Sequence, residues 1–250
     1  MKRFLVLITA LLVSDLLLAQ CRIAVRATSF PPYFIIEQHN NYQGLDVELT
    51  NALLKEANCL FEFQKLPWKR GLQLLKIGTL DLMSGMSISV KRQQYIRFIG
   101  PMREESMALL VPKHSNYQIT SLDDLKVLDK PIGIVSGLFY GAVFAKKYKK
   151  DAAFAANFDV ANSSQSNLSN LINHRLSAVV GDLFNMVHWL KANKLNNQYE
   201  IHPFFINRDD VYFGFSKRNV SADNIANLTA ANARLMAAGT YRSIIEQYRQ

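Results

Sequence analysis

Short apolar runs alternate with helical patterns along most of this chain, and that alternation constrains the fold more than any other feature. Before residue 90, strand patterns at 22–28, 60–65 and 80–83 enclose helical patterns at 46–57 and 67–78. Strands that alternate with helices in this way form parallel sheets with helices packed on their faces. The sequence therefore predicts an α/β fold.

The same alternation restarts after a polar stretch at residues 113–126, which is typical of a boundary between two units. Strand patterns before and after that stretch lie at 96–101, 107–111, 132–135, 158–160, 178–180, 199–201 and 211–216. Helical patterns lie at 138–149, 164–174, 182–192, 225–238 and 241–248. Two α/β units joined by strands, with a helical tail, predict two lobes.

The N-terminus is typical of an export signal. Lys2 and Arg3 precede an apolar run, and a small residue, Ala19, closes it. A positive start, a short apolar segment and a small residue describe a secretory signal peptide, so we predict one at residues 1–19. A lipoprotein acylated at Cys21 and an uncleaved membrane anchor are the alternatives. Removal of residues 1–19 leaves 27 basic and 19 acidic residues, a net charge of +8.

The densest basic cluster comprises Lys146, Lys147, Lys149 and Lys150. Such a cluster can contact nucleic acid or anionic lipid, or it can be the solvated end of a helix. The sequence favours a solvated helix end, because the protein is predicted to be exported, and we expect no nucleic-acid partner.

Two cysteines, Cys21 and Cys59, each stand at the start of a strand pattern. If those strands are neighbours in a parallel sheet, both sulfur atoms lie at the same edge, where a disulfide is possible. Two buried thiols are the alternative.

The segments that follow the predicted strands are rich in aromatic, hydroxyl and basic residues. They are SFPPYF (29–34), LPWKR (66–70), SGMSISVKR (84–92), VSGLFY (135–140) and GDLFN (181–185). In open α/β sheets the ligand crevice lies beyond the carboxyl ends of the strands. With one carboxylate, Asp182, this set could bind a small zwitterion.

The segment at residues 84–92 is the strongest single candidate. Small residues follow a short strand, and Lys91 and Arg92 open a helical turn. Free backbone N–H groups, hydroxyls and a guanidinium suit a carboxylate. A plain loop with a solvated Arg92 is the alternative.

Motifs for catalysis or for a cofactor are missing from the sequence. The five histidines are scattered, and neither C-x-x-C nor H-E-x-x-H occurs. Neither the Walker A pattern nor G-x-G-x-x-G occurs. We therefore expect no metal, no cofactor and no enzymatic activity.

In this order and at these separations, several stretches resemble the periplasmic solute-binding proteins of ABC transporters, in the family that binds polar amino acids (bacterial extracellular solute-binding proteins, family 3). The stretches are GLDVELTNALLKEAN, LPWKRGLQLLKIGTLDLMSGMSISVKRQQYIRFIGPM, SLDDLKVLDKPIGIVSG, LSNLINHRLSAVVGD and MAAGTYRSIIEQY. The resemblance implies a type II periplasmic-binding-protein-like fold in which each lobe is a mostly parallel sheet flanked by helices, with a two-strand hinge. We expect lobe 1 at residues 20–111 and 204–250, and lobe 2 at residues 112–203.

The resemblance also implies roles for individual residues. Arg92 falls where the family's arginine grips the ligand α-carboxylate, assisted by Gly85 and Ser87. Asp182 falls where a carboxylate receives the α-ammonium, although it could be only a helix N-cap. Phe30 lies where an aromatic ring stacks on the ligand.

Trp68, Arg70 and Phe139 complete the predicted site. Trp68 and Arg70 lie at the cleft wall by resemblance, and core packing is the alternative for Trp68 and for Phe30. Leu138 and Phe139 follow Gly137 where the family often has a Thr that helps hold the carboxylate. This departure predicts a more apolar wall on lobe 2.

The implied function is capture of a small polar ligand, an amino acid or a related carboxylate, in a cleft between the lobes. The protein is then expected to be a periplasmic monomer that delivers its ligand to the membrane permease of an ABC transporter. A sensory protein that signals to a membrane receptor is one alternative. A dehydratase on the same fold is another, with Glu104 or Asp182 as the acid–base group.

Overall fold

The computed structural model describes residues 21–38 and 41–248. The predicted signal peptide, at residues 1–19, lies outside the described residues. None of the helices within the described ranges combines the length and the hydrophobicity needed to span a bilayer.

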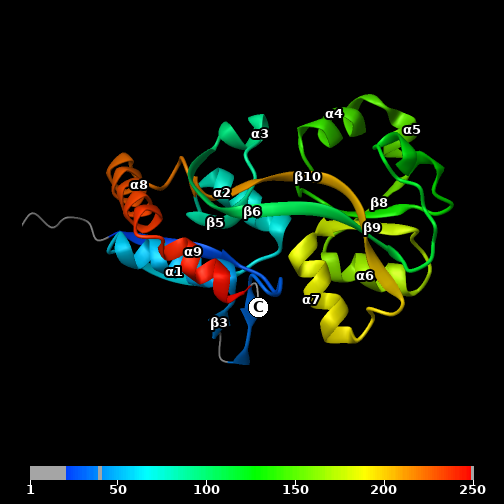
Figure 1. Cartoon of the computed structure of the whole chain (residues 1–250). Coiled ribbons are helices and arrows are strands. Elements are labelled where there is room, and N and C mark those ends of the chain that lie inside the picture. The colour runs from blue at the N-terminus through cyan, green and yellow to red at the C-terminus, as the bar shows by residue number, and fades with distance from the viewer. Residues whose placement is uncertain (1–20, 39–40, 249–250) are drawn as a thin grey trace, which may run out of the picture.

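Two lobes lie side by side and share one continuous sheet of eight strands within the described residues (Figure 1). The strand order is β4-β1-β5-β10-β6-β9-β7-β8. β1 pairs in parallel with β4 and with β5, and β7 pairs in parallel with β8 and with β9. The central strands β6 and β10 are antiparallel to each other and to the strands beside them. The predicted fold class, two mostly parallel α/β lobes, is confirmed.

The first lobe carries helices on both faces of its strands. Its elements are β1 (Arg22–Ala27), β2 (Ile35–Ile36), β3 (Tyr42–Gln43), α1 (Leu45–Glu56), β4 (Leu60–Lys65), α2 (Trp68–Ile77), β5 (Leu82–Met86), α3 (Val90–Gln93), α8 (Ala222–Ala237) and α9 (Thr240–Gln247). Helices α1, α8 and α9 bury apolar residues such as Leu49, Leu53 and Leu228 on one face. Helix α2 buries Leu74 and Leu75 on the other.

The second lobe repeats this three-layer arrangement. Its elements are a 3₁₀ helix (Asp123–Val127), β7 (Ile132–Val135), α4 (Ala142–Lys150), α5 (Ala152–Ala155), β8 (Phe158–Ala161), α6 (Ser164–Ile172), β9 (Ala178–Asp182) and α7 (Leu183–Asn193). Phe144, Phe154 and Phe158 form an aromatic core on one face. Leu168, Leu171 and Trp189 pack on the opposite face.

Two long strands join the lobes, and here the sequence-based expectation of four short strands was wrong. β6 runs without a break over Ile96–Pro112, and β10 over Tyr199–Ser216. The two strands pair from Tyr199 with Pro112 to Ser216 with Ile96. Their middle sections pass between the lobes. The middle of β6 is polar, and the middle of β10 (residues 202–210) contains Pro203 and a run of apolar residues, so neither has the alternating pattern that marks a strand. The expected lobe boundaries, at 111/112 and 203/204, fall at the last residues of β6 and inside β10.

The loop before α4 is also longer than predicted. A helical pattern from residue 138 was expected, but α4 begins at Ala142. The hydroxyl of Tyr140 accepts a hydrogen bond from the backbone N–H of Val135 (2.7 Å), which holds the loop against the end of β7. Leu138 and Phe139 therefore project from a loop at a strand end.

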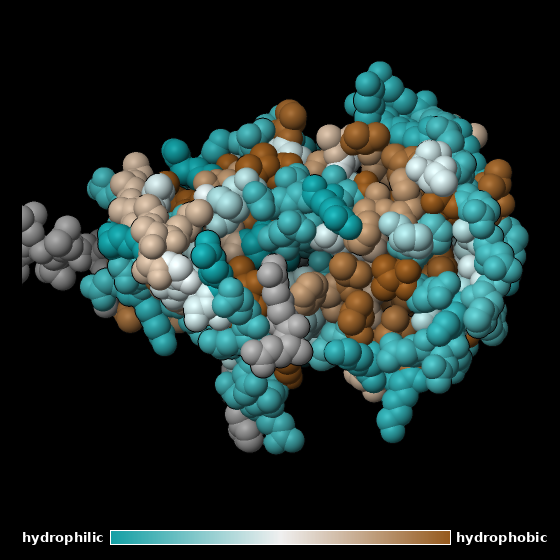
Figure 2. Space-filling view, in the orientation of Figure 1, coloured by the Kyte–Doolittle hydropathy of each residue, from teal (hydrophilic) through white to brown (hydrophobic). Residues whose placement is uncertain are grey.

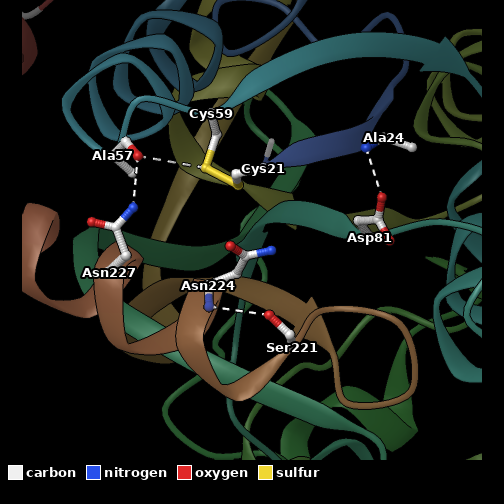
Figure 3. The surroundings of a disulfide bond; sticks show 8 residues. All are labelled: Cys21, Ala24, Ala57, Cys59, Asp81, Ser221, Asn224 and Asn227. Atoms are coloured by element: carbon white, nitrogen blue, oxygen red, sulfur yellow. Dashed lines mark hydrogen bonds between the residues drawn. A yellow bond between two sulfur atoms is a disulfide. The ribbon is translucent and has the colours of Figure 1, made fainter. Parts of the chain in front are cut away.

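A disulfide joins Cys21 to Cys59, with 4.6 Å between the Cα atoms (Figure 3). The two residues directly precede β1 and β4, whose parallel register pairs Arg22 with Leu60. The bridge thus lies at the amino-terminal edge of these strands, where the sequence placed both sulfur atoms. A thiol that is held in this bridge is not available for acylation, which removes the basis for a lipid anchor at Cys21.

Replacing both cysteines by serine is expected to lower the free energy of unfolding by about 4 kcal/mol, because the bridge closes a long loop, with a sequence separation of 38. Chemical denaturation of the wild type and of the double variant measures this difference. Ligand binding is expected to be unchanged, since the bridge lies at the sheet edge opposite the carboxyl ends of the strands. Wild type and variant with equal stability under oxidising conditions would contradict the prediction.

Candidate functional site

A cavity of about 710 Å³ lies between the two lobes. Its walls are the segments that follow β1, β4 and β5 in the first lobe and β7, β8 and β9 in the second. Each of the five segments singled out in the sequence contributes to this lining, and so does a sixth, Asn162–Gln165, at the start of α6. The carboxyl ends of six parallel strands therefore meet at one cleft.

Most of the residues predicted for the site line this cleft. They are Phe30, Trp68, Gly85, Ser87, Arg92, Phe139 and Asp182. The structure brings these side chains together at the cleft, and their roles toward a ligand stay predictions.

Arg70 does not line the cleft, so its predicted place on the cleft wall was wrong. It is exposed on α2, two residues after Trp68. Two residues correspond to about 200° around a helix, so a helix that turns Trp68 to the cleft turns Arg70 away from it.

Arg92 is 5% exposed and lies in the cleft wall. One terminal nitrogen donates to the backbone oxygen of Ser87 (2.8 Å), and the other donates to the backbone oxygen of Gly137 (3.1 Å). Among the described residues no carboxylate forms an ion pair with it. Burial holds the pKa of this guanidinium below its usual range. A buried cation without an anionic partner is a binding group for a carboxylate.

The ring of Trp68 lies close to two buried cations, Arg92 and Arg26. The guanidinium carbon of Arg26 is 4.9 Å from the centroid of the indole ring, and that of Arg92 is 5.6 Å from it. Arg26 also donates from Nε to the backbone oxygen of Leu66 (3.1 Å). Its stem passes under α2 at Gly71, where a Cβ atom would come within 2.7 Å of it. Sequence reasoning missed Arg26, because an arginine within a strand pattern looks like an ordinary solvent-facing residue.

The end of β5 supplies small polar groups beside Arg92. The hydroxyl of Ser84 is buried and has no hydrogen-bond partner among the described residues, although the residue lines the cavity. Gly85 has φ +64°, and a Cβ atom there would come within 2.9 Å of the Asp46 carboxylate. Its own N–H points to the sulfur of Met102 (3.2 Å). Gly85 thus makes room for a buried ion pair, and Ser84 presents a free hydroxyl.

That buried ion pair joins Arg103 of β6 to Asp46 of α1. Nε of Arg103 lies 2.7 Å from one carboxylate oxygen, and a terminal nitrogen lies 3.2 Å from the other. The guanidinium also lies over the ring of Tyr33, 3.8 Å from its centroid. This fork geometry neutralises both charges. No sequence pattern indicated this pair, since Asp46 looks like an ordinary acidic residue in the first turn of a helix.

Asp182 is 4% exposed and caps α7, accepting from the backbone N–H of Asn185 (2.8 Å). Burial raises the pKa of its carboxyl, while Arg103 and the Asn185 N–H act in the opposite direction. The alternative weighed in the sequence, an N-cap, is therefore present, and the same carboxylate faces the cleft.

Glu105 is a second cleft carboxylate, and sequence reasoning missed it. Its side chain is 11% exposed, and its one ion pair among the described residues is a long contact of 3.9 Å to Arg103. Burial raises the pKa of Glu105 to about 8, although Arg103 opposes the shift. The neighbouring Glu104, which the sequence offered as an acid–base group, is exposed and lies outside this cleft, because successive residues of a strand face opposite sides.

The two lobes touch at both ends of the cleft. Trp68 donates from Nε1 to the backbone oxygen of Gly137 (3.0 Å), which also accepts from Arg92. At the other end the side-chain amide of Asn185 donates to the backbone oxygen of Pro31 (2.5 Å). Both contacts join a first-lobe segment to a second-lobe segment.

The second-lobe wall of the cleft is mixed. Val135, Leu138, Phe139 and Trp189 supply its apolar part, which includes the two residues after Gly137 that the sequence singled out. Its polar part is supplied by Asn162, Ser163, Ser164, Gln165, Asn185 and His188. Figure 2 shows that hydrophobic residues also gather on the surface over α7. The charged side chains of the cleft lie mostly on the first lobe and on β6, and the second lobe adds Asp182 together with several other polar side chains.

A two-lobed α/β protein with charged and aromatic residues converging on an interlobe cleft belongs to the class of solute-binding proteins. Residues 21–250 match the model of the bacterial extracellular solute-binding proteins, family 3. The chain is a member of that family, and the resemblance noted in the sequence is confirmed.

Two relatives match nearly the whole chain. A probable histidine-binding protein of Neisseria gonorrhoeae is 28% identical over 229 residues, which cover 91% of this chain and 82% of the relative. The ABC transporter arginine-binding protein 1 of Escherichia coli K12 is 29% identical over 227 residues, or 89% of this chain and 88% of the relative.

Solved structures share the fold. An ancestral arginine-binding protein bound to arginine has a TM-score of 0.75 and 24% identity, with 92% of this chain and 97% of that chain covered. A histidine kinase sensor domain has a TM-score of 0.78 and 20% identity, with coverage of 92% and 96%. The fold is therefore one that is found both in binding proteins and in sensor domains.

Glu105→Gln is expected to stabilise the ligand-free protein at pH 8 and to leave its stability nearly unchanged near pH 4. The folded protein holds the Glu105 proton up to a pKa of about 8, against 4.5 for an ordinary glutamate. The folded state therefore binds more protons than the unfolded state between these values, and stability falls as the pH rises through them. Glu105→Gln removes this loss of stability at high pH, and thermal unfolding of the variant and the wild type at pH 4 and pH 8 measures the difference.

Glu104→Gln is the matched control, because it makes the same change on the exposed side of the same strand. Equal effects of Glu105→Gln at both pH values would show that Glu105 is not held protonated in the folded protein.

Proposed function

We propose that this protein is exported to the periplasm and captures an α-amino acid between its lobes for uptake by an ABC transporter. The observation that carries the proposal is Arg92, a buried guanidinium that lines the cleft and forms no ion pair with a carboxylate of the described residues. A ligand carboxylate would form the missing ion pair with this guanidinium.

The groups around Arg92 suit the rest of an amino acid. Ser84 lines the same cavity, and its hydroxyl, which has no partner among the described residues, would add a hydrogen-bond donor to the site. Asp182 lies on the opposite lobe and suits the α-ammonium, because a buried carboxylate is stabilised by a cation. Phe30 and Trp68 offer aromatic surface for the remainder of the ligand. A ligand held by Arg92 and Asp182 would bridge the two lobes and favour their closure.

The relatives support an amino acid as the ligand. One curated relative is named as a probable histidine-binding protein and the other as an arginine-binding protein. We infer a similar ligand class for this chain, delivered by a monomer to a membrane permease.

We infer binding rather than turnover. The curated relatives are named as amino acid-binding proteins, and Glu104, one of the two acid–base candidates, lies outside the cleft. General acid–base catalysis needs a group within reach of the reacting proton, and Glu104 does not meet that condition.

Arg92→Ala is expected to weaken the binding of the amino acid by about tenfold to a hundredfold, because hydrogen bonds to a charged group contribute about 1.5–3 kcal/mol. Isothermal titration calorimetry, after a thermal-shift screen of the common L-amino acids, measures the loss.

Arg70→Ala is the matched control, since it removes an exposed arginine of the same lobe and is expected to leave affinity unchanged. The proposal fails if no amino acid binds to the wild type at millimolar concentration, or if Arg92→Ala binds as tightly as the wild type.

A further inference from the structure

Six ionisable side chains in the cleft are largely buried, and their pairing is incomplete. They are the cations Arg26, Arg92 and Arg103 and the carboxylates Asp46, Glu105 and Asp182. Arg103 and Asp46 neutralise each other through two hydrogen bonds. Arg92 and Asp182 are the groups proposed for the carboxylate and the ammonium of an amino acid. Arg26 and Glu105 are the two buried charged residues of the cleft that still have no assigned partner.

Arg26 is held by its own lobe. It donates to the backbone oxygen of Leu66, lies over the ring of Trp68 and packs against Gly71. These contacts fix the guanidinium against the indole ring, so a ligand is not needed to satisfy it.

Glu105 has no comparable partner. No hydrogen bond to its carboxylate is found within the described part of the chain, and the Arg103 nitrogen at 3.9 Å lies beyond hydrogen-bond distance. That guanidinium is already committed to Asp46 and to the backbone oxygen of Glu104. The carboxyl therefore faces the cavity with unused acceptor oxygens, which is costly unless something binds there.

The position of Glu105 relative to Asp182 follows from the register of the sheet. Met107 of β6 is the partner of Asp182 of β9. Glu105 lies two residues before Met107, on the same side of the strand, and both residues line the cavity. Glu105 and Asp182 are therefore diagonal neighbours on adjacent strands, and such pairs lie roughly 7–8 Å apart. That distance is comparable to the separation between the α-ammonium and the terminal cationic group of an extended lysine or arginine.

We propose that Glu105 receives a second, cationic group of the ligand and thereby selects amino acids with a positively charged side chain. The inference rests on the proposed capture of an α-amino acid by Arg92 and Asp182, and it adds the residue that would decide which amino acid is bound. A neutral side chain would leave the Glu105 carboxyl in the cavity without a partner, whereas a cationic one would pair with it in its ionised form.

Ligand binding is then linked to the release of a proton. Burial keeps Glu105 protonated at neutral pH in the ligand-free protein, since its pKa is raised to about 8. The charged groups that act on it are Arg103 on its own strand, Asp182 at the end of β9, Asp46 on α1 and Arg92 on α3. Three further titratable residues, Arg26, Lys65 and His188, line the same cavity. A cation beside Glu105 favours the ionised form, so the preference for a cationic ligand rises with pH up to about 8.

The test compares L-arginine with L-citrulline, in which a neutral ureido group replaces the guanidinium while the zwitterionic part is the same. We expect the wild type to bind L-arginine at least about tenfold more tightly at pH 8. We also expect the affinity ratio to fall as the pH is lowered to 6, by up to about tenfold per pH unit. This measurement needs no variant, so it does not depend on whether a variant folds.

Glu105→Gln is expected to abolish most of the preference for L-arginine and the pH dependence of the ratio, while L-citrulline binding changes little. Glu104→Gln, the exposed neighbour, is expected to behave as the wild type does. Calorimetry in two buffers of different ionisation enthalpy adds a second readout, because release of a proton on binding L-arginine should disappear in Glu105→Gln.

The outcomes separate the two proposals. A wild type that binds both probes equally at every pH overturns the role of Glu105 and leaves amino acid capture standing. Equal weakening of both probes by Glu105→Gln also overturns it, since a purely structural role predicts that result. Failure of the wild type to bind any amino acid overturns the proposed function and this inference together.

Discussion

The pairing of β6 with β10 is the interaction on which the rest of the structure depends. These two antiparallel strands run through both lobes and form the centre of the sheet, so each lobe completes its three parallel strands against them (Figure 1). A long ladder of paired residues, with register shifts near Phe205 and Val211, links the lobes through a connection that is only two strands wide. The cleft exists because the parallel strands of both lobes end beside this connection.

The same strands also bring charge into the cleft. Arg103 and Glu105 project from the middle of β6, where the chain passes from one lobe to the other. Arg103 is matched by Asp46, which removes the cost of burying either charge alone. Glu105, Asp182 and Arg92 form no ion pair at hydrogen-bond distance within the described residues, and they are the groups that we propose for the ligand. A binding site that holds uncompensated groups in a preformed position gains affinity when the ligand supplies the missing partners.

Sequence periodicity was sufficient to predict most helices and strands, because their apolar faces pack against a sheet and repeat accordingly. It was also sufficient to place the cleft, since the ends of parallel strands meet at one edge whatever the details of packing. The segment at residues 84–92 was singled out on composition alone, and Arg92 does lie buried in the cleft. Arg70 shows the limit of this reasoning, because two residues in the same segment face different sides of one helix.

The sequence by itself determined the α/β class, the two lobes, the edge that carries the cleft and the edge that carries the Cys21–Cys59 bridge. Each of these follows from local periodicity and from the direction of parallel strands. Only the tertiary structure decided which charged side chains share the cleft. Arg103 and Glu105 lie in a polar stretch without a strand pattern, and Asp46 lies far from them in the sequence. The three side chains meet because β6 continues across the lobes and pairs with β10. A strand that is held by its neighbours rather than by its own apolar residues leaves no signature in the sequence.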